Sequence, residues 1–241
     1  MNEVLKSAAL EGEYYKEVYG FFHKYFDDSK HILDFLERVF LNDSIDKTPR
    51  RMMNLLIRWV DLAEMIHNTK PGRDPLVVAC VRTCIESICV QTEKTKDDKK
   101  NFFEENLSEE GAAYIRGSFR TVIKEDKINH KEIYDNNSPL RDFDEMIFGI
   151  RNRVVHDGDY WSSQVFSHVS SDMDWVSAYS IERGNRKSEI VYETNMRYER
   201  FMFYFVEAVM SYIDRYTHQI GIEKIEMSQD VDLPGQAVSK E

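Results

Sequence analysis

The sequence predicts a mainly α protein, with an antiparallel helical bundle, an N-terminal helical layer, and a small β-hairpin inserted before the last helix. Two observations predict this fold class. Over most of the 241 residues, apolar side chains recur at three- and four-residue intervals, which is the period of one helix face. Between residues 160 and 193 the pattern changes to alternation around a Gly-containing turn, which is typical of short strands. Hydrophobic residues make up 42% of the chain, enough for a packed core.

Residues 1–70 are expected to form the N-terminal layer. Aromatic residues at helical spacing predict a first helix within 9–26, and the same period returns over 31–42. Pro49 can open a third helix, because proline fits the first helical turn. The break at 69–72, which ends in Pro-Gly, separates this layer from the rest of the chain. The layer either packs on the bundle or offers a surface to a partner.

Residues 74–221 are expected to form the bundle. The helix over 76–95 is the most apolar in the chain, with Asp74 as its cap and Pro75 in its first turn. Besides the helix that carries the motif described below, the expected helices cover 102–107, 112–124 and 195–220.

The end of the last helix is predicted from its glycine. Gly221 follows the last periodic residue, and glycine commonly ends helices. The segment 222–241 has no clear period and is expected to be a flexible tail.

The predicted insertion spans 160–193. Its strands are expected within 163–169 and 175–192, which are rich in Ser, Val, Tyr and Ile, and the sequence Arg-Gly-Asn-Arg at 183–186 favours a hairpin turn. Two or three antiparallel strands are predicted. They either cap the core or form a flap near His156.

One amphipathic helix, starting near Pro139 and ending at Gly158, carries the residues that point to a function. Arg151, Asn152 and His156 lie together near its C-terminal end. On an α-helix, Asn152 and His156 share a face one turn apart, with Arg151 beside them. A cation, an amide and an imidazole are therefore expected to converge.

This set of side chains suits a phosphate ester. Arginine binds phosphate oxygens with a planar, permanently charged fork, and histidine exchanges protons near neutral pH. The amide can hold the imidazole in one tautomer or bind a substrate oxygen. Asp157 and Asp159 follow the helix without an obvious third ligand for a divalent cation. We therefore expect chemistry without a metal or another cofactor.

The motif and its surroundings resemble the HEPN superfamily. The run Arg-Asn-Arg-Val-Val-His at 151–156 has the form RNxxxH, which is preferred in the ribonuclease branches, and it closes a long amphipathic helix. Upstream, ACVRTCIESICVQTEKTKDDKKNFFEENL is similar to an earlier family helix with Glu86 in its middle, followed by a charged connection. The resemblance covers 74–221 and is closest to the Apea-like, stand-alone type.

This resemblance implies a HEPN-type antiparallel bundle that forms a homodimer and cleaves RNA without a metal. The catalytic residues would be Arg151, His156 and Asn152, paired across the dimer interface. Two alternatives stay open. An inactive bundle would bind RNA, a nucleotide or a cognate protein partner, and a purely structural protein would pair Arg151 with Glu86 and use His156 to cap its own helix.

Four further residues are candidates for positioning or substrate binding. Glu86 either forms an ion pair with Arg82 one turn away or reaches across to orient Arg151. Arg153 adds local positive charge to the motif. Tyr160 and Trp161 follow the helix, where they either stack on a base of the RNA or anchor packing.

Composition sets limits on partners and location. The formal net charge of −11 argues against a protein that coats nucleic acid non-specifically, because such proteins are usually basic. Cys80, Cys84 and Cys89 lack the spacing of a zinc site and are interpreted as small buried hydrophobic residues. Reduced cysteines and the lack of a long apolar segment predict a cytoplasmic protein without membrane contact.

Overall fold

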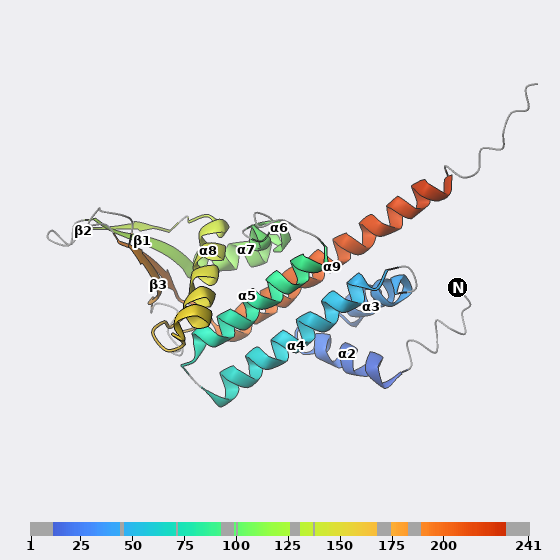
Figure 1. Ribbon diagram of the computed structural model, residues 1–241, viewed down its shortest axis with the longest axis horizontal. Coiled ribbons are helices and arrows are strands. Elements are labelled where there is room, and N and C mark those ends of the chain that lie inside the picture. Colours follow the sequence, from blue (N-terminus) through green and yellow to red (C-terminus); the bar gives the residue numbers. More distant parts are fainter. Residues whose placement is uncertain are drawn as a thin grey trace, which may run out of the picture.

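The computed structural model shows a mainly helical protein with a four-stranded antiparallel sheet at one end (Figure 1). The prediction of a mainly α fold is confirmed. The structure describes residues 12–43, 46–70, 72–92, 99, 101–125, 131–136, 138–167, 175–182 and 189–229.

The N-terminal layer packs on the bundle. Its helices are α2 (Glu13–His23), α3 (Ser29–Asn42) and α4 (Thr48–Thr69). All three were expected, and Pro49 lies in the first turn of α4 as predicted. Helix α4 runs beside α5 and α9, and α3 packs on α9. Phe22, Phe35 and Leu56 are fully buried in one hydrophobic cluster that continues into the bundle. The layer and the bundle therefore share a core.

The bundle places the motif helix between a long helix and the sheet. Its helices are α5 (Asp74–Gln91), α6 (Phe102–Asn106), α7 (Glu109–Ser118), α8 (Leu140–Asn152) and α9 (Tyr198–Gln229). Helix α8 continues into a π-helical turn, η2 (Arg153–Asp157). Helix α5 is buried by α4 on one side and by α8 on another, which explains why its sequence is apolar almost all round.

Asp74 has a different role from the predicted cap. It is the first residue of α5 rather than the residue before it, so the capping position falls on Arg73. Its buried Oδ2 atom instead accepts hydrogen bonds from the backbone N–H groups of Val165 and Phe166, at 2.9 and 2.8 Å. Asp74 therefore anchors the segment that follows the motif, because a buried carboxylate needs such partners.

The last helix does not end at Gly221. Helix α9 continues to Gln229, so the predicted end of the helix is wrong, and the segment predicted as a tail begins as part of this helix. A single glycine within a helix costs only about 1 kcal/mol relative to alanine, and good helix formers follow it here. Residues 230–241 lie outside the described part of the chain.

The helix predicted over 112–124 ends early. Helix α7 stops at Ser118, and the chain continues directly as strand β1 (Phe119–Glu125). Three consecutive β-branched residues, at 121–123, favour the extended conformation, and pairing with two neighbouring strands decides in its favour.

The sheet draws its strands from both sides of the motif helix. Its other strands are β2 (Lys131–Asp135), β3 (Val176–Glu182) and β4 (Glu189–Thr194), in the order β2-β1-β4-β3. Strands β3 and β4 confirm the predicted antiparallel pair, while the predicted turn at 183–186 lies outside the described residues. The prediction of a strand over 163–169 is wrong for 163–167, the part of this segment that the structure describes. Only a single bridge, Phe166 to Met196, forms there, because Asp74 binds the neighbouring N–H groups.

A close approach between β3 and α8 fixes the position of the motif helix. Gly149 is buried against Tyr179, and a Cβ atom at Gly149 would lie 2.6 Å from Cε1 of that ring. Glycine is needed because this distance is far below van der Waals contact. One turn later Arg153 donates from Nη2 to the carbonyl of Ser180 on β3, at 2.7 Å. The motif helix is therefore held by the sheet on one side and by α5 on the other.

Candidate functional site

The motif occupies the end of α8 and the π-helical turn that follows. Arg151 and Asn152 are the last residues of α8, and His156 lies in η2. In a regular α-helix, side chains five residues apart point about 140° apart. The wider π turn reduces this offset between Arg151 and His156, and such turns are frequent at functional sites. Gly158 ends the turn as predicted, with a φ of 67° that glycine adopts without strain.

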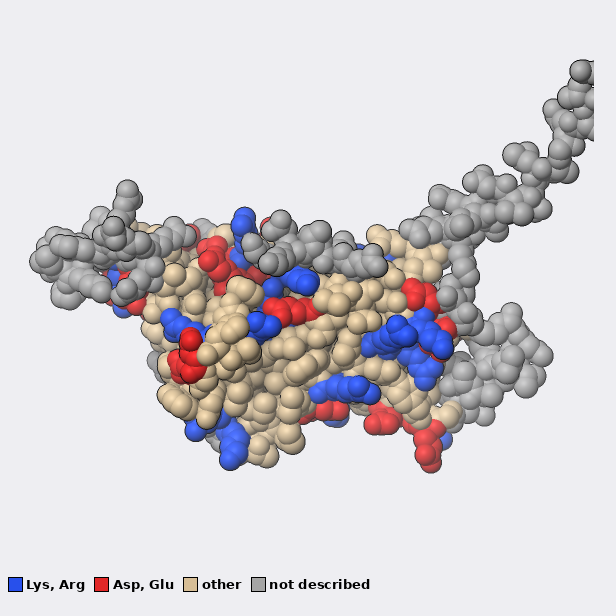
Figure 2. Space-filling model, in the orientation of Figure 1, with Lys and Arg blue, Asp and Glu red and all other residues tan. Residues whose placement is uncertain are grey.

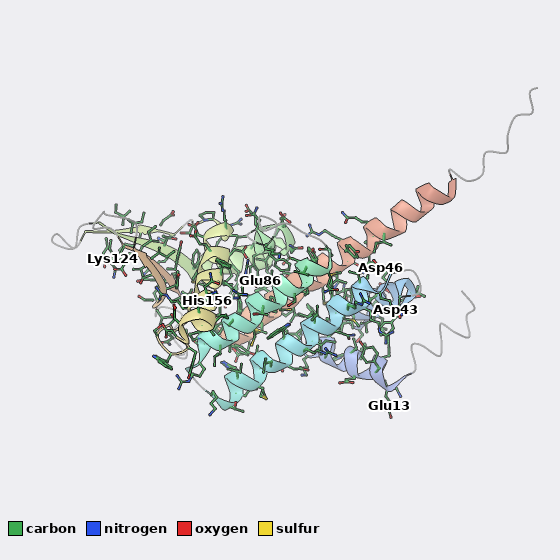
Figure 3. All side chains as sticks on the ribbon, viewed as in Figure 1. Glu13, Asp43, Asp46, Glu86, Lys124 and His156 are labelled. Atoms are coloured by element: carbon green, nitrogen blue, oxygen red, sulfur yellow. The ribbon has the colours of Figure 1, made fainter. Side chains whose placement is uncertain are left out.

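A carboxylate from the neighbouring helix holds Arg151. Nη2 of Arg151 donates to Oε2 of Glu86 on α5 at 2.8 Å, and Nη1 donates to Oδ1 of Asn152 at 3.0 Å. Figure 3 shows Glu86 on α5 and His156 on the adjacent end of the motif helix. Each terminal nitrogen of Arg151 carries a second hydrogen beyond these bonds. The guanidinium is therefore fixed in position, while it retains hydrogens for a further acceptor.

Both predicted contacts of Glu86 are present at once. Oε1 accepts from Nε of Arg82, at 3.2 Å, while Oε2 accepts from Arg151. The Glu86 side chain is 21% exposed and that of Arg151 is 23% exposed, so the pair lies at the edge of the core rather than in open solvent. An ion pair there is screened less than one on the surface.

A buried ion pair lies beneath Glu86. Arg82 is 2% exposed, and its Nη1 lies 3.6 Å from Oδ1 of Asp144 on α8, which is 1% exposed. The same nitrogen donates to the carbonyl of Lys99, and Oδ2 of Asp144 accepts from the N–H of Phe103 at 3.2 Å. Charges of alternating sign thus run from Asp144 through Arg82 and Glu86 to Arg151.

This burial gives a testable pH dependence. Desolvation raises the pKa of Asp144 well above its usual range, and the Arg82 cation offsets only part of that rise. Because the folded state holds this proton more tightly than the unfolded chain, the stabilisation is complete below the unfolded pKa of about 4. It is lost as the pH rises from there through the folded pKa.

The measurement is urea unfolding of wild type and Asp144→Asn at a series of pH values from 4 upward. The asparagine still accepts from Phe103 but cannot titrate. The unfolding free energy of wild type, relative to the variant, should fall with pH by at most about 1.4 kcal/mol per unit. Parallel curves for the two proteins would contradict the raised pKa.

His156 is exposed at the surface of η2. Among the described residues its imidazole has no hydrogen bond, ion pair or ring contact, and the turn is closed by the backbone N–H of Gly158 on the carbonyl of Arg153. The imidazole therefore does not cap its helix within this part of the chain. No hydrogen bond joins Asn152 to the imidazole in the described structure, and the amide oxygen of Asn152 instead accepts from Arg151. His156 is accessible to a ligand.

The side chains of the other predicted site residues make no hydrogen bond, ion pair or ring contact with Glu86 or Arg151 in the part of the chain that the structure describes. Arg153 contacts the sheet, and Tyr160 and Trp161 contact each other. The guanidinium of Arg153 packs on the ring of Tyr179 at 4.2 Å and binds β3, so it is directed to the sheet and not to Glu86. Tyr160 and Trp161 are 36% and 62% exposed, and their rings meet edge to face at 4.6 Å. Arg73 lies 5.5 Å over the ring of Tyr160.

Three exposed apolar side chains flank the group formed by Glu86, Arg151 and His156. Phe148 and Val155, on α8 and η2, are 41% and 56% exposed, and Val90, one turn after Glu86 on α5, is 59% exposed. We call Val90, Phe148 and Val155 the apolar flank. Large apolar side chains gathered around a polar site favour a protein–protein contact.

The three cysteines lie in the interior. Cys80, Cys84 and Cys89 are all buried as expected, and burial raises the pKa of the Cys80 thiol to about 11, which keeps it protonated at neutral pH. No group of three or more metal-ligating side chains gathers anywhere in the described ranges.

None of the described helices has both the length and the apolar character that a membrane-spanning segment needs.

The buried ion pair of Arg82 with Asp144 was not predicted from the sequence. Asp144 falls within the apolar face of α8, between Leu140 and Ile147, and a carboxylate at such a position signals a buried partner. Phe148 falls outside that face, which signals an exposed contact surface. Arg82 was considered only as a partner of Glu86.

Chemically, the site combines a fixed cation with an accessible group that can carry a proton. Arg151 can bind an anionic oxygen while Glu86 holds it, and His156 can exchange protons with solvent or a ligand. No family model matches the chain, and comparisons with curated proteins and with solved structures found no match either.

Proposed function

We propose that the protein is a metal-independent endoribonuclease of the HEPN type. The observation that carries this proposal is the juxtaposition of Arg151, held by Glu86 at 2.8 Å, with the exposed His156 on the same helix end. An RNA phosphate placed between them would meet a bidentate cation and a proton donor or acceptor.

The reaction uses a nucleophile that RNA itself supplies. One imidazole accepts the proton of the 2′-hydroxyl as its oxygen forms a bond to phosphorus. The bond from phosphorus to the 5′-oxygen breaks, and that oxygen receives a proton from an imidazolium. Arg151 stabilises the charge that develops on the phosphate oxygens, while Asn152 and Glu86 keep its guanidinium in position. The products are a 2′,3′-cyclic phosphate and a 5′-hydroxyl.

A homodimer would supply two imidazoles to one composite site. A two-fold axis near η2 brings the two copies of His156 together, so that one acts as base and the other as acid. The apolar flank supports this arrangement, because its exposed side chains, on the same helices as the motif and Glu86, gain from burial.

Replacing Phe148 with glutamate should weaken the dimer. Two-fold symmetry would place two carboxylates in the interface, so the dissociation constant should rise by at least about tenfold. Light scattering after size exclusion measures the mass over a dilution series. Met65→Glu is the matched control, since Met65 is 55% exposed on α4, a helix of the N-terminal layer that carries no motif residue. A wild type that is monomeric at micromolar concentration, or a Phe148→Glu variant that stays dimeric, would contradict the composite site.

The charge distribution supports local rather than broad recognition of RNA. On the face shown in Figure 2, Lys and Arg side chains are interspersed with Asp and Glu over a mostly uncharged surface. With a net charge of −11, binding would depend on a few placed cations such as Arg151. Affinity for duplex DNA should therefore be weak.

A second candidate is an inactive bundle that binds RNA, a nucleotide or a protein partner. The same Glu86 contact favours it, because an arginine already paired with a carboxylate has less charge left for catalysis. The apolar flank would then bind the partner instead of a second copy.

Cleavage of an end-labelled RNA in excess EDTA tests the proposed function. The expected result is cleavage with the chelator present and fragments that end in a 2′,3′-cyclic phosphate, detected by resistance to ligation at the 3′ end and by mass. Intact RNA at every protein concentration would favour the binding module.

A further inference from the structure

The loop that follows the motif presents two aromatic rings to solvent in a fixed arrangement. Trp161 is 62% exposed, five residues after His156. The N–H of Ser162 donates to Oδ1 of Asp159 at 3.2 Å, and its hydroxyl donates to the other carboxylate oxygen. The N–H of Asp159 donates to the carbonyl of Arg153, at 3.2 Å. These bonds tie the loop to η2, so the position of the Trp161 ring is coupled to that of the motif.

A polar pocket of about 520 Å³ opens beside Trp161. Its wall carries the side chains of Ser163, Gln164 and Ser177, which can both donate and accept hydrogen bonds. Its lining also includes Asp74, which is 2% exposed and fixed by the N–H groups of the segment after the loop. The pocket thus offers a flat exposed ring at its edge and hydrogen-bonding groups within.

We propose that Trp161 and this pocket form a nucleobase subsite, in which one unpaired base of the RNA stacks on the indole ring and its polar edge enters the pocket. The proposal rests on the proposed function, since it places this base next to the phosphate bound by Arg151. Aromatic rings stack on any base, whereas hydroxyl and amide groups recognise its edge, so the subsite would combine general affinity with a preference among bases.

The chemistry of the pocket favours a base over a protein side chain. An apolar side chain of a partner would meet the polar wall of Ser163, Gln164 and Ser177 and would strip water from it without compensation. A base satisfies such a wall at its edge while its faces stack. The cation of Arg73, 5.5 Å over the neighbouring Tyr160 ring, adds a positive charge beside the path of the phosphate backbone.

The test uses a single-stranded oligonucleotide with 2′-O-methyl groups, which removes the nucleophile and therefore separates binding from cleavage. Fluorescence anisotropy of the labelled strand gives dissociation constants for wild type, Trp161→Ala and Trp161→Phe. Trp161→Ala should bind about tenfold more weakly, and Trp161→Phe should retain most of the affinity. The control is Tyr134→Ala, because Tyr134 is a comparably exposed ring, 49%, on strand β2 of the sheet. Thermal unfolding checks that the variants fold.

A series of oligonucleotides with one abasic site each gives a sharper readout. For wild type, loss of the base at one position should weaken binding about as much as Trp161→Ala does. For Trp161→Ala, loss of the same base should weaken binding by less than it does for wild type, because only the contacts of the base edge with the pocket remain to be lost.

The outcomes separate this inference from the proposed function. Cleavage by wild type, with equal binding by Trp161→Ala and Tyr134→Ala, would overturn the subsite and leave the nuclease. Binding that depends on Trp161, without cleavage of ordinary RNA, would support the subsite on a binding module. No binding by wild type would overturn the subsite whatever the cleavage result.

Discussion

His156→Ala should lower the rate of RNA cleavage by about 10²- to 10⁴-fold, the range that general acid–base catalysis contributes. Arg151→Ala should lower it by a similar factor, because the charge of the transition state loses its main cation. The measurement is the initial rate on end-labelled RNA in excess EDTA. His218→Ala is the matched control, since His218 is also exposed, with 64% of its side chain accessible on α9. It should cleave like wild type.

A Glu86→Gln variant separates positioning from catalysis. Glutamine still accepts a hydrogen bond from Arg151 but no longer carries charge, so the rate should fall less than in Arg151→Ala. If His156→Ala cleaved as fast as His218→Ala, the assignment of His156 would be wrong. If Arg151→Ala and Glu86→Gln had the same small effect, the pair would serve structure alone.

Arg82→Met should destabilise the fold by up to about 3–5 kcal/mol at a pH where Asp144 is ionised, and by less where Asp144 holds its proton. The methionine keeps an apolar stem of similar length, but it leaves the buried Asp144 without its cation, and breaking a buried ion pair costs about that much. Equilibrium unfolding in urea measures the loss. Arg38→Ala is a suitable comparison, because the pair of Arg38 with Asp214 is about a third exposed, and such pairs contribute about 0–1 kcal/mol.

A double variant tests the reason for this loss. Adding Asp144→Asn to Arg82→Met removes the orphaned charge while keeping an acceptor for the N–H of Phe103. Most of the stability should return. If Arg82→Met lost less than about 1 kcal/mol of unfolding free energy, or if the double variant were no more stable than Arg82→Met, the ion pair would contribute little to stability.

Much of the helical framework could be predicted because its signals are local. The period of apolar residues gave α3 and α4 closely, and Pro49 marked the start of α4. Strand β1 could not be found this way. Phe119, Val122 and Ile123 fit a helix face as well as a strand, and the choice depends on pairing with residues far along the chain, such as Ile190. The end of α9 was missed for a similar reason, because a glycine only weakly opposes a helix that its neighbours favour.

The candidate site also has some features that could be predicted from the sequence and others that could not. Arg151, Asn152 and His156 lie on one helix, so their proximity follows from the sequence, although the π turn that adjusts their relative direction does not. The contact of Glu86 with Arg151 spans 65 positions, so the sequence offered it only as an alternative to a pair of Glu86 with Arg82. The buried position of Asp144 depends on how α8 packs against α5, which no local pattern specifies.

The most direct test compares cleavage of one RNA with cleavage of its 2′-O-methyl counterpart by wild type and by His156→Ala, all in excess EDTA. We expect wild type to cleave only the RNA and to leave a 2′,3′-cyclic phosphate, and His156→Ala to cleave neither strand at a comparable rate. Cleavage of the 2′-O-methyl strand, or cleavage of RNA that survives in His156→Ala, would contradict attack by the 2′-hydroxyl at this site.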